Sequence, residues 1–394
     1  MHYSSLTQRI AGEGASAWNI HFRAKAREAA GEAIILLSVG DPDFDTPTPI
    51  VEAAVTSLRS GGTHYAHVQG KAALRQQIAA DHRRRGGHAG VDAENVMVLA
   101  GAQCGLYATL QCLLDAGDEV IVPQPAYVTY EAAVRATGAT PTWVGLRAEE
   151  AFLPRPADLA AAITPRTRAL LINSPHNPTG HCLDRERWEA IATLCREHDL
   201  WLVVDAVYAD LIFDGEAGSP DALPGMAERT AVIGSLSKSH AMTGWRLGWV
   251  VAPRTLIGHL VNLALCMLYG SPPFVQDAAI TALAEPHGEL DTMRETYRAR
   301  RDAVVETLAS SDVVSTLTPA AGMFMMVDIR ATGLSAQAFA DRLLDDHAVS
   351  VLAGEAFGPA AAGFIRVSLT ADVATLREAC RRLERCARAC PVTL

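Results

Sequence analysis

Short apolar runs alternate with longer amphipathic segments through the middle of the chain, and this alternation predicts the fold. Seven runs share the apolar character of buried strands: Val96–Ala100, Glu119–Val122, Thr142–Leu146, Ala169–Ile172, Trp201–Val204, Ala231–Gly234 and Leu247–Ala252. The segments between them are mostly helical in pattern. Strands joined by helices predict an α/β fold with a mainly parallel seven-stranded sheet covered on both faces. Ligands of such sheets bind beyond the carboxyl ends of the strands.

The rest of the chain predicts a second, smaller α/β domain. The runs Gly322–Val327 and Phe364–Ser368 predict strands of its sheet, and the charged segment Arg294–Arg301 predicts a helix leading to it. Residues 5–30 predict an amphipathic helix that ends near Gly31. We therefore expect an N-terminal arm with part of the small domain, a large domain and a C-terminal small domain, over residues 1–47, 48–290 and 291–394.

Composition narrows the class of protein without identifying it. The chain has 394 residues, of which 49% are hydrophobic and 20% charged, as in an ordinary globular enzyme. A net charge of −10 argues against nucleic acid as a partner, and no apolar run is long enough to cross a membrane. The eight cysteines form no Cys-x-x-Cys pair, so we expect reduced thiols in a cytoplasmic protein and no metal site.

The most informative stretch lies between the last two apolar runs and contains Lys238. Burying a charged lysine costs free energy, so burial lowers its pKa and leaves a neutral, nucleophilic amine. Ser235, Ser237 and Arg246 stand in the same stretch and suit a bound phosphate. A surface lysine in a polar turn is the alternative. The flanking apolar runs favour a Schiff-base lysine beside a phosphate subsite.

The first two strands are also followed by candidate ligands. Gly101, Ala102 and Gln103 open a helix, where small residues let backbone N–H groups meet an anion. This turn does not match Gly-x-Gly-x-x-Gly, which argues against a nicotinamide enzyme. Tyr127 follows the second strand and offers a ring for stacking on a planar heteroaromatic group, or for filling the core.

The later strands end in polar side chains. Asn177 lies in the loop Asn-Ser-Pro-His-Asn-Pro-Thr-Gly after the fourth strand. Asp205 ends the fifth strand, and a buried carboxylate there needs a cationic or donor partner such as a pyridinium nitrogen. Tyr208, three residues later, is placed to donate a hydrogen bond to a ring oxygen.

The Ser-x-Ser-Lys…Gly-x-Arg pattern and the asparagine loop resemble the class I/II aminotransferases of fold type I, which use pyridoxal 5′-phosphate. The resemblance spans nearly the whole chain. It implies that Lys238 forms the Schiff base and moves a proton, and that Asp205 faces the ring nitrogen. It also implies that Asn177 and Tyr208 bond the ring hydroxyl and that Asn177 helps to hold the substrate carboxylate. Ala206 departs from the family, which often has glutamate there.

The resemblance assigns four further positions. Gly40, in a Gly-[Glu/Asp]-Pro-x-Phe-x-x-Pro segment, would lie beside the substrate carboxylate, and Arg366 would grip that carboxylate with two hydrogen bonds. Trp18 would belong to the wall of the substrate pocket, with Ser16, Gln103 and Tyr269 nearby. Tyr65 would reach across a homodimer interface to the cofactor phosphate of the other subunit.

The implied activity is transamination from an amino acid to a 2-keto acid by a ping-pong mechanism. The stretches 235–251, 262–272 and 334–359 resemble a family member that uses L-arginine and pyruvate, so these are the expected substrates. Aspartate, aromatic or alanine specificity remains open, as does a C–S or elimination lyase of the same fold. A transcription regulator of this fold would need a DNA-binding domain before residue 40, for which the chain has no room.

Overall fold

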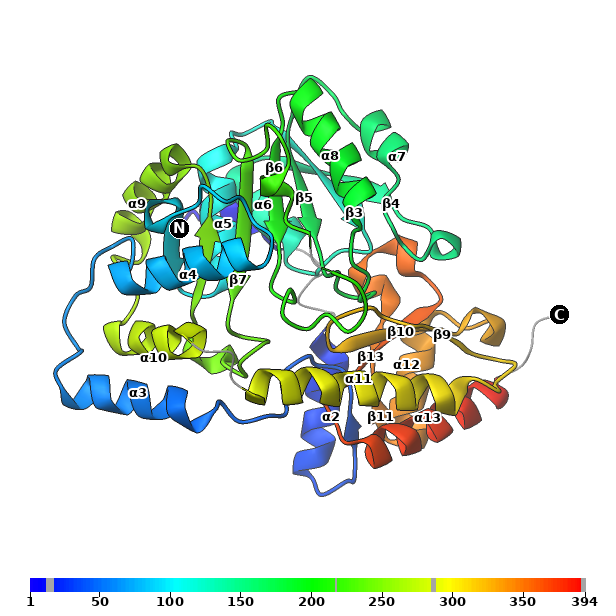
Figure 1. The fold of residues 1–394 in the computed structure, drawn as a ribbon. Coiled ribbons are helices and arrows are strands. Elements are labelled where there is room, and N and C mark those ends of the chain that lie inside the picture. Colours follow the sequence, from blue (N-terminus) through cyan, green and yellow to red (C-terminus); the bar gives the residue numbers. More distant parts are fainter. Residues whose placement is uncertain (12–17, 217, 285–287, 391–394) are drawn as a thin grey trace.

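The computed structural model describes residues 1–11, 18–216, 218–284 and 288–390. Two α/β regions make up the molecule, and Figure 1 shows the larger one above the smaller one. The larger region contains a seven-stranded sheet and the smaller one a four-stranded sheet. The predicted fold class, a large and a smaller α/β region, is confirmed.

The large sheet consists of the seven apolar runs that the sequence pattern predicts. In spatial order its strands are β2 (Val96–Leu99), β8 (Gly248–Val251), β7 (Thr230–Ser235), β6 (Trp201–Asp205), β5 (Thr167–Asn173), β3 (Glu119–Gln124) and β4 (Thr140–Gly145). β8 is antiparallel to both of its neighbours, and the other pairs are parallel.

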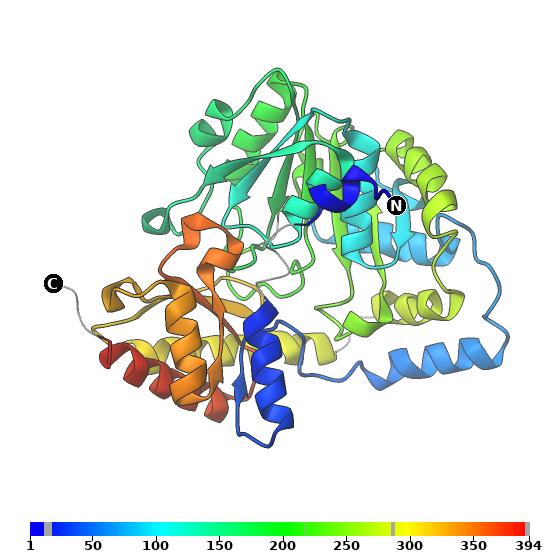
Figure 2. The same cartoon turned by 180° about the vertical axis from the view of Figure 1, so that it is seen from behind.

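Helices cover both faces of this sheet, as Figures 1 and 2 show from opposite sides. One layer contains α5 (Ala102–Leu113), α6 (Tyr130–Thr137) and α9 (Arg254–Met267). The other contains α3 (Thr48–Arg59), α4 (Ala72–Arg84), α7 (Pro156–Ala161), α8 (Arg185–Glu197) and α10 (Pro273–Ala284). Along β2 the side chains alternate between the layers: Val96 and Val98 face the second, and Met97 and Leu99 the first. This two-sided burial explains why the strands are continuously apolar.

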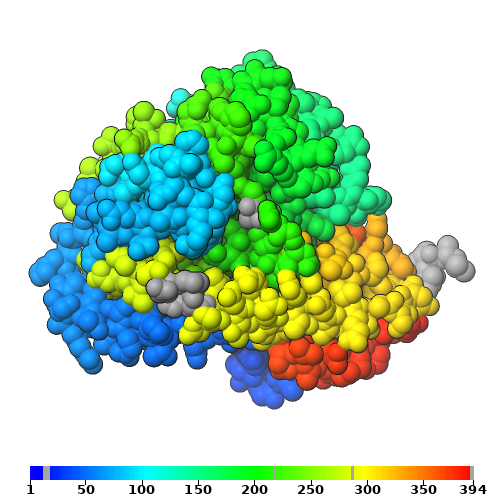
Figure 3. Space-filling model, in the orientation of Figure 1, coloured from blue at the N-terminus to red at the C-terminus, as the bar shows by residue number. Residues whose placement is uncertain are grey.

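The smaller region is built on an antiparallel sheet. Its strands, in spatial order, are β12 (Leu352–Ala353), β13 (Phe364–Ser368), β10 (Phe324–Asp328) and β9 (Ser315–Leu317). A short parallel pair, β1 (Ile35–Leu36) and β11 (Val349–Ser350), lies beside it. The packed helices are α2 (Asn19–Ala29), α11 (Gly288–Leu308), α12 (Ala336–His347) and α13 (Val373–Arg388). Figure 3 shows α11, in yellow, along the junction between the two regions.

The expected single helix over residues 5–30 is wrong. α1 (Ser5–Arg9) ends where the Arg9 guanidinium donates to the carbonyls of Arg135 (3.0 Å) and Ala136 (3.4 Å) at the end of α6. α1 therefore lies on the large region and α2 in the small one (Figure 2). Within the described ranges, no helix has the length and apolar character that crossing a membrane requires.

Candidate active site

A cavity of about 480 Å³ opens at the carboxyl ends of the parallel strands, where Asn173, Asp205 and Ser235 are the last residues of β5, β6 and β7. Because β8 is antiparallel and Gly248 pairs with Ser235, the chain before β8 returns to the same edge. The predicted site residues on the cavity wall are Trp18, Gly40, Ala102, Gln103, Tyr127, Asn177, Asp205, Tyr208, Ser235, Ser237, Lys238, Arg246 and Arg366.

The amine of Lys238 points into this cavity from the turn after β7. Its Nζ donates a hydrogen bond to the backbone carbonyl of Gly40 at 2.8 Å. Burial lowers the pKa of Lys238 to about 8, which the negative charge of Asp41 opposes and the positive charges of Arg366 and Arg246 assist. A substantial fraction of the amine is therefore neutral near neutral pH and can act as a nucleophile or a base.

Asp205 is held as a partly buried acceptor by donors on two sides. Tyr130 Oη donates to Asp205 Oδ2 at 2.6 Å, and the Val207 amide donates to Oδ1 at 3.3 Å. Burial raises the pKa of Asp205, and the hydrogen bond from Tyr130 works against that rise. A carboxylate in this position suits a protonated ring nitrogen. That nitrogen would supply the positively charged partner that Asp205 does not have among the described residues.

Tyr130 is a site residue that the sequence reasoning missed. It lies in the first turn of α6, one helical turn after Tyr127, and the two rings are 5.7 Å apart in an edge contact. That spacing of two tyrosines after a strand end is the signal from which it could have been found. Asn173 was missed as well. Its Nδ2 donates to the Asp205 carbonyl at 2.9 Å, and its Oδ1 accepts from the Asn177 amide at 2.7 Å.

Arg366 is a buried cation whose charge has no carboxylate partner within the described ranges. It is 2% exposed; Nη1 donates to Asn177 Oδ1 at 3.1 Å and Nη2 to the Ser38 carbonyl at 3.0 Å. Its Nε is buried without an acceptor, and its guanidinium lies 4.1 Å from the Phe324 ring centre. Burial lowers the pKa of Arg366 to about 10. A carboxylate ligand would satisfy this group.

An anion subsite forms where α5 begins. Gly101, the residue before α5, has φ +87°, and a Cβ added there would lie 2.5 Å from Arg246 Nη2. A side chain at this position would be strained by the positive φ and would displace the guanidinium. Arg246 Nη1 donates to the Thr243 carbonyl at 2.7 Å, and no described acidic side chain pairs with it. The helix N-terminus, this arginine, Ser235 and Ser237 together suit a phosphate.

Gly40 has no room for a side chain because a Cβ there would lie 2.1 Å from the Phe324 ring. Its segment is anchored at two further points. Both carboxylate oxygens of Asp43 accept from Arg300 at 2.7 Å, and Thr46 Oγ1 donates to the Ala241 carbonyl at 2.6 Å. These contacts hold in place the Gly40 carbonyl, which accepts the hydrogen bond from Lys238.

The remaining predicted residues divide between the cavity and the surface. Tyr208 is buried and hydrogen-bonded to Asn177, and burial raises its pKa, so its hydroxyl stays protonated. Tyr65 lies outside the cavity, is 87% exposed and contacts the ring of Tyr269 at 5.0 Å. Tyr269 does not line the cavity, and Ser16 falls outside the described residues.

An amine, a partly buried carboxylate, an anion subsite and an unpaired arginine around one cavity suit pyridoxal phosphate and an α-carboxylate ligand. The donor set fits the cofactor at each end: the phosphate subsite has an unpaired arginine, and the ring end has Asp205 and Tyr208.

The comparisons with known proteins give the family. The profile of aminotransferase class I and II matches residues 32–383, and the chain belongs to this family. It is 65% identical over 98% of both chains to arginine–pyruvate transaminase AruH of Pseudomonas aeruginosa, and 36% identical to an aspartate aminotransferase of Pyrococcus horikoshii, covering 91% of this chain and 92% of that one. The structure resembles aspartate aminotransferase from Thermus thermophilus with maleate, with a TM-score of 0.93 and 33% identity over 98% of this chain and 100% of that one. The protein is therefore an aminotransferase that uses pyridoxal 5′-phosphate.

Proposed function

We propose that the protein transfers the α-amino group of L-arginine to pyruvate. The supporting observation is the 65% identity, over 98% of each chain, to an arginine–pyruvate transaminase. The other relatives named above are aspartate aminotransferases at about half that identity. Arginine as donor and pyruvate as acceptor are therefore favoured over the aspartate, aromatic and alanine specificities.

When bound, the cofactor supplies an electrophilic carbonyl carbon and an electron-withdrawing ring. Ser235, Ser237 and Arg246, with the amides of Gly101, Ala102 and Gln103 at the start of α5, would hold its phosphate. Tyr127 would stack on the ring, and Asn177 and Tyr208 would donate to the ring oxygen. Asp205 would keep its negative charge beside the ring nitrogen, which makes the ring a stronger electron sink.

The chain's own side chains then position the amino acid and move its proton. Arg366 binds the α-carboxylate through its guanidinium fork, and the carboxylate gives the buried Nε–H group the acceptor that it otherwise does not have. Lys238 Nζ takes the proton from Cα because its pKa of about 8 leaves part of the amine neutral. The Gly40 carbonyl, an acceptor for that amine, aims it.

A homodimer in the cytoplasm completes the proposal, with Tyr65 of each subunit reaching the phosphate subsite of the other. Tyr65 is exposed and does not line the cavity of its own chain, as expected of a residue that acts in a second copy. The ring contact with Tyr269 holds its position.

A panel of amino donors, assayed with pyruvate and with 2-oxoglutarate, tests the function. Arginine with pyruvate should give the highest kcat/KM, and no ammonia should form without a keto acid. If arginine is among the poorest donors, the substrate assignment fails while the family assignment stands. Ammonia release that needs no acceptor would instead indicate a lyase.

A further inference from the structure

Two carboxylates line the described part of the active-site cavity, and they differ in whether they are engaged. Asp205 is partly buried and accepts hydrogen bonds from Tyr130 and from a backbone amide. Asp41 is exposed, and among the described residues it makes no hydrogen bond and no ion pair. Asp41 is thus an acceptor left open on the cavity wall.

The position of Asp41 is set by the contacts on either side of it. Gly40, directly before it, is packed against Phe324 and accepts the Lys238 amine. Asp43, two residues after it, is bound by both terminal nitrogens of Arg300. The backbone at Asp41 is therefore held in place near the Lys238 amine, and the negative charge of Asp41 acts on the pKa of that amine.

The positive charges on the same wall already have roles. Lys238 is the reacting amine, Arg246 belongs to the phosphate subsite and Arg366 to the α-carboxylate. The part of the donor that extends away from Arg366 therefore meets an unpaired negative charge. Trp18, also on the wall, offers an aromatic surface for a flat cation.

We propose that Asp41 binds the cationic side chain of the donor amino acid and selects for it. This rests on the proposed arginine donor. A guanidinium presents parallel N–H groups that match a carboxylate, and its flat face can stack on the Trp18 indole. An acidic residue at this position belongs to the family segment, so the inference depends on the carboxylate being unpaired here and not on its presence.

The test compares L-arginine with L-citrulline, which has the same length but carries a neutral ureido group. The wild-type protein should prefer arginine. Asp41→Asn should lower kcat/KM for arginine about ten- to hundredfold, the effect of losing one charge-assisted pair, and change citrulline about threefold or less. Asp41→Glu keeps the charge and should retain the preference. Asp45→Asn, an exposed acid of the same segment outside the cavity, is the matched control and should behave as wild type.

The outcomes separate this inference from the proposed function. If the wild type prefers arginine and Asp41→Asn keeps that preference, Asp41 is not the partner, although arginine remains the donor. If both donors lose activity equally, Asp41 acts through Lys238 or through folding, and the inference is wrong. If the wild type does not prefer arginine to citrulline, the donor assignment and the role of Asp41 fall together.

Discussion

At the scale of single residues, the site consists of ionisable groups whose charged forms are destabilised by burial. Lys238 carries a lowered pKa and Asp205 a raised one, and both shifts come first from the removal of water. Arg366 remains charged but has an Nε without an acceptor. A folded chain tolerates such groups only where hydrogen bonds offset part of the free-energy cost of desolvation. The hydrogen bond from Tyr130 to Asp205 is the shortest such compensation at this site.

Tyr130→Phe tests that compensation in the protein without cofactor. The substitution keeps the ring and removes the donor, so the free energy of unfolding at neutral pH should fall by about 1.5–3 kcal/mol, as for other hydrogen bonds to charged groups. Folding raises the pKa of Asp205, so its stabilising contribution belongs to low pH and is lost as the pH rises. Losing the donor raises that pKa further. The wild-type advantage should therefore be full above the higher pKa that Asp205 has in the variant, and it should shrink as the pH falls towards the wild-type pKa.

Urea unfolding at several pH values measures this difference. Tyr107→Phe is the matched control, because the Tyr107 hydroxyl makes no hydrogen bond within the described part of the chain. A Tyr130→Phe protein that is as stable as wild type at neutral pH would show that water replaces the tyrosine as donor.

Most of the site could be predicted because its chemistry follows strand ends, which an apolar run marks in the sequence. Lys238, Asp205 and Asn177 each come just after such a run. Tyr130 is different: it lies inside a helix, where a tyrosine is as consistent with core packing as with a bond to a carboxylate 75 positions later. That pairing depends on how α6 lies against β6, which local pattern does not contain.

At the scale of elements, the same reasoning explains one success and one failure. The strands of the large sheet are buried on both faces, so their apolar runs identify them. Periodicity in the N-terminal segment predicts one long helix, yet α1 ends at Arg9 and α2 begins at Asn19. Long-range bonds from Arg9 to α6 decide where α1 lies, and they leave no local mark in the sequence.

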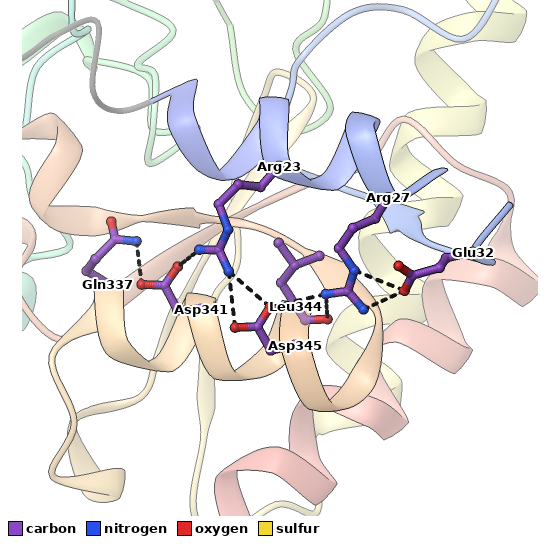
Figure 4. A network of polar contacts seen from close by, with 7 residues as sticks. All are labelled: Arg23, Arg27, Glu32, Gln337, Asp341, Leu344 and Asp345. Carbon is purple, nitrogen blue, oxygen red and sulfur yellow. Dashed lines mark hydrogen bonds and ion pairs between the residues drawn. The ribbon is translucent and has the colours of Figure 1, made fainter. Parts of the chain in front are cut away.

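Both ionic and apolar contacts attach α2 to the small region, and Figure 4 shows the ionic ones between α2 and α12. Arg23 bonds Asp341 and Asp345, and Arg27 bonds Asp345, Glu32 and the Leu344 carbonyl. Arg23 is 46% exposed, so water and salt screen its ion pairs. Ile20, on the same helix, is buried in the core of the small region.

Ile20→Ala should therefore destabilise α2 far more than Arg23→Ala. Loss of the buried side chain should cost about 2–5 kcal/mol, and loss of the exposed ion pairs less than about 1 kcal/mol. Added salt should reduce the cost of losing the ion pairs further. Hydrogen exchange of the α2 amides measures both. Equal effects of the two substitutions would mean that the ionic network in Figure 4 contributes as much as the apolar face to holding the helix.

At the scale of the whole molecule, parallel strands collect residues far apart in the chain at one edge of the sheet, and the small region closes that edge with Arg366 from β13. Tyr65, like Tyr269, is a predicted residue that this single chain leaves outside the cavity. The tyrosine and its neighbour Tyr269 are large, exposed rings. Sequence pattern cannot distinguish such a residue from an ordinary surface tyrosine, because the proposed role depends on a second copy.

Hybrid dimers test whether Tyr65 acts in the partner. In a hybrid of wild-type and Lys238→Ala subunits, the cofactor can be fixed by borohydride only in the wild-type subunit, and the partner supplies an intact Tyr65. In the matched hybrid the partner carries Lys238→Ala and Tyr65→Phe together. Loss of one hydrogen bond to a phosphate should weaken cofactor binding at the wild-type site about tenfold or more in the second hybrid only. Equal binding in both would show that Tyr65 does not act at the phosphate subsite of its partner. A wild-type protein that sediments as a monomer would remove the basis for the exchange, because no second copy would then be present to supply Tyr65.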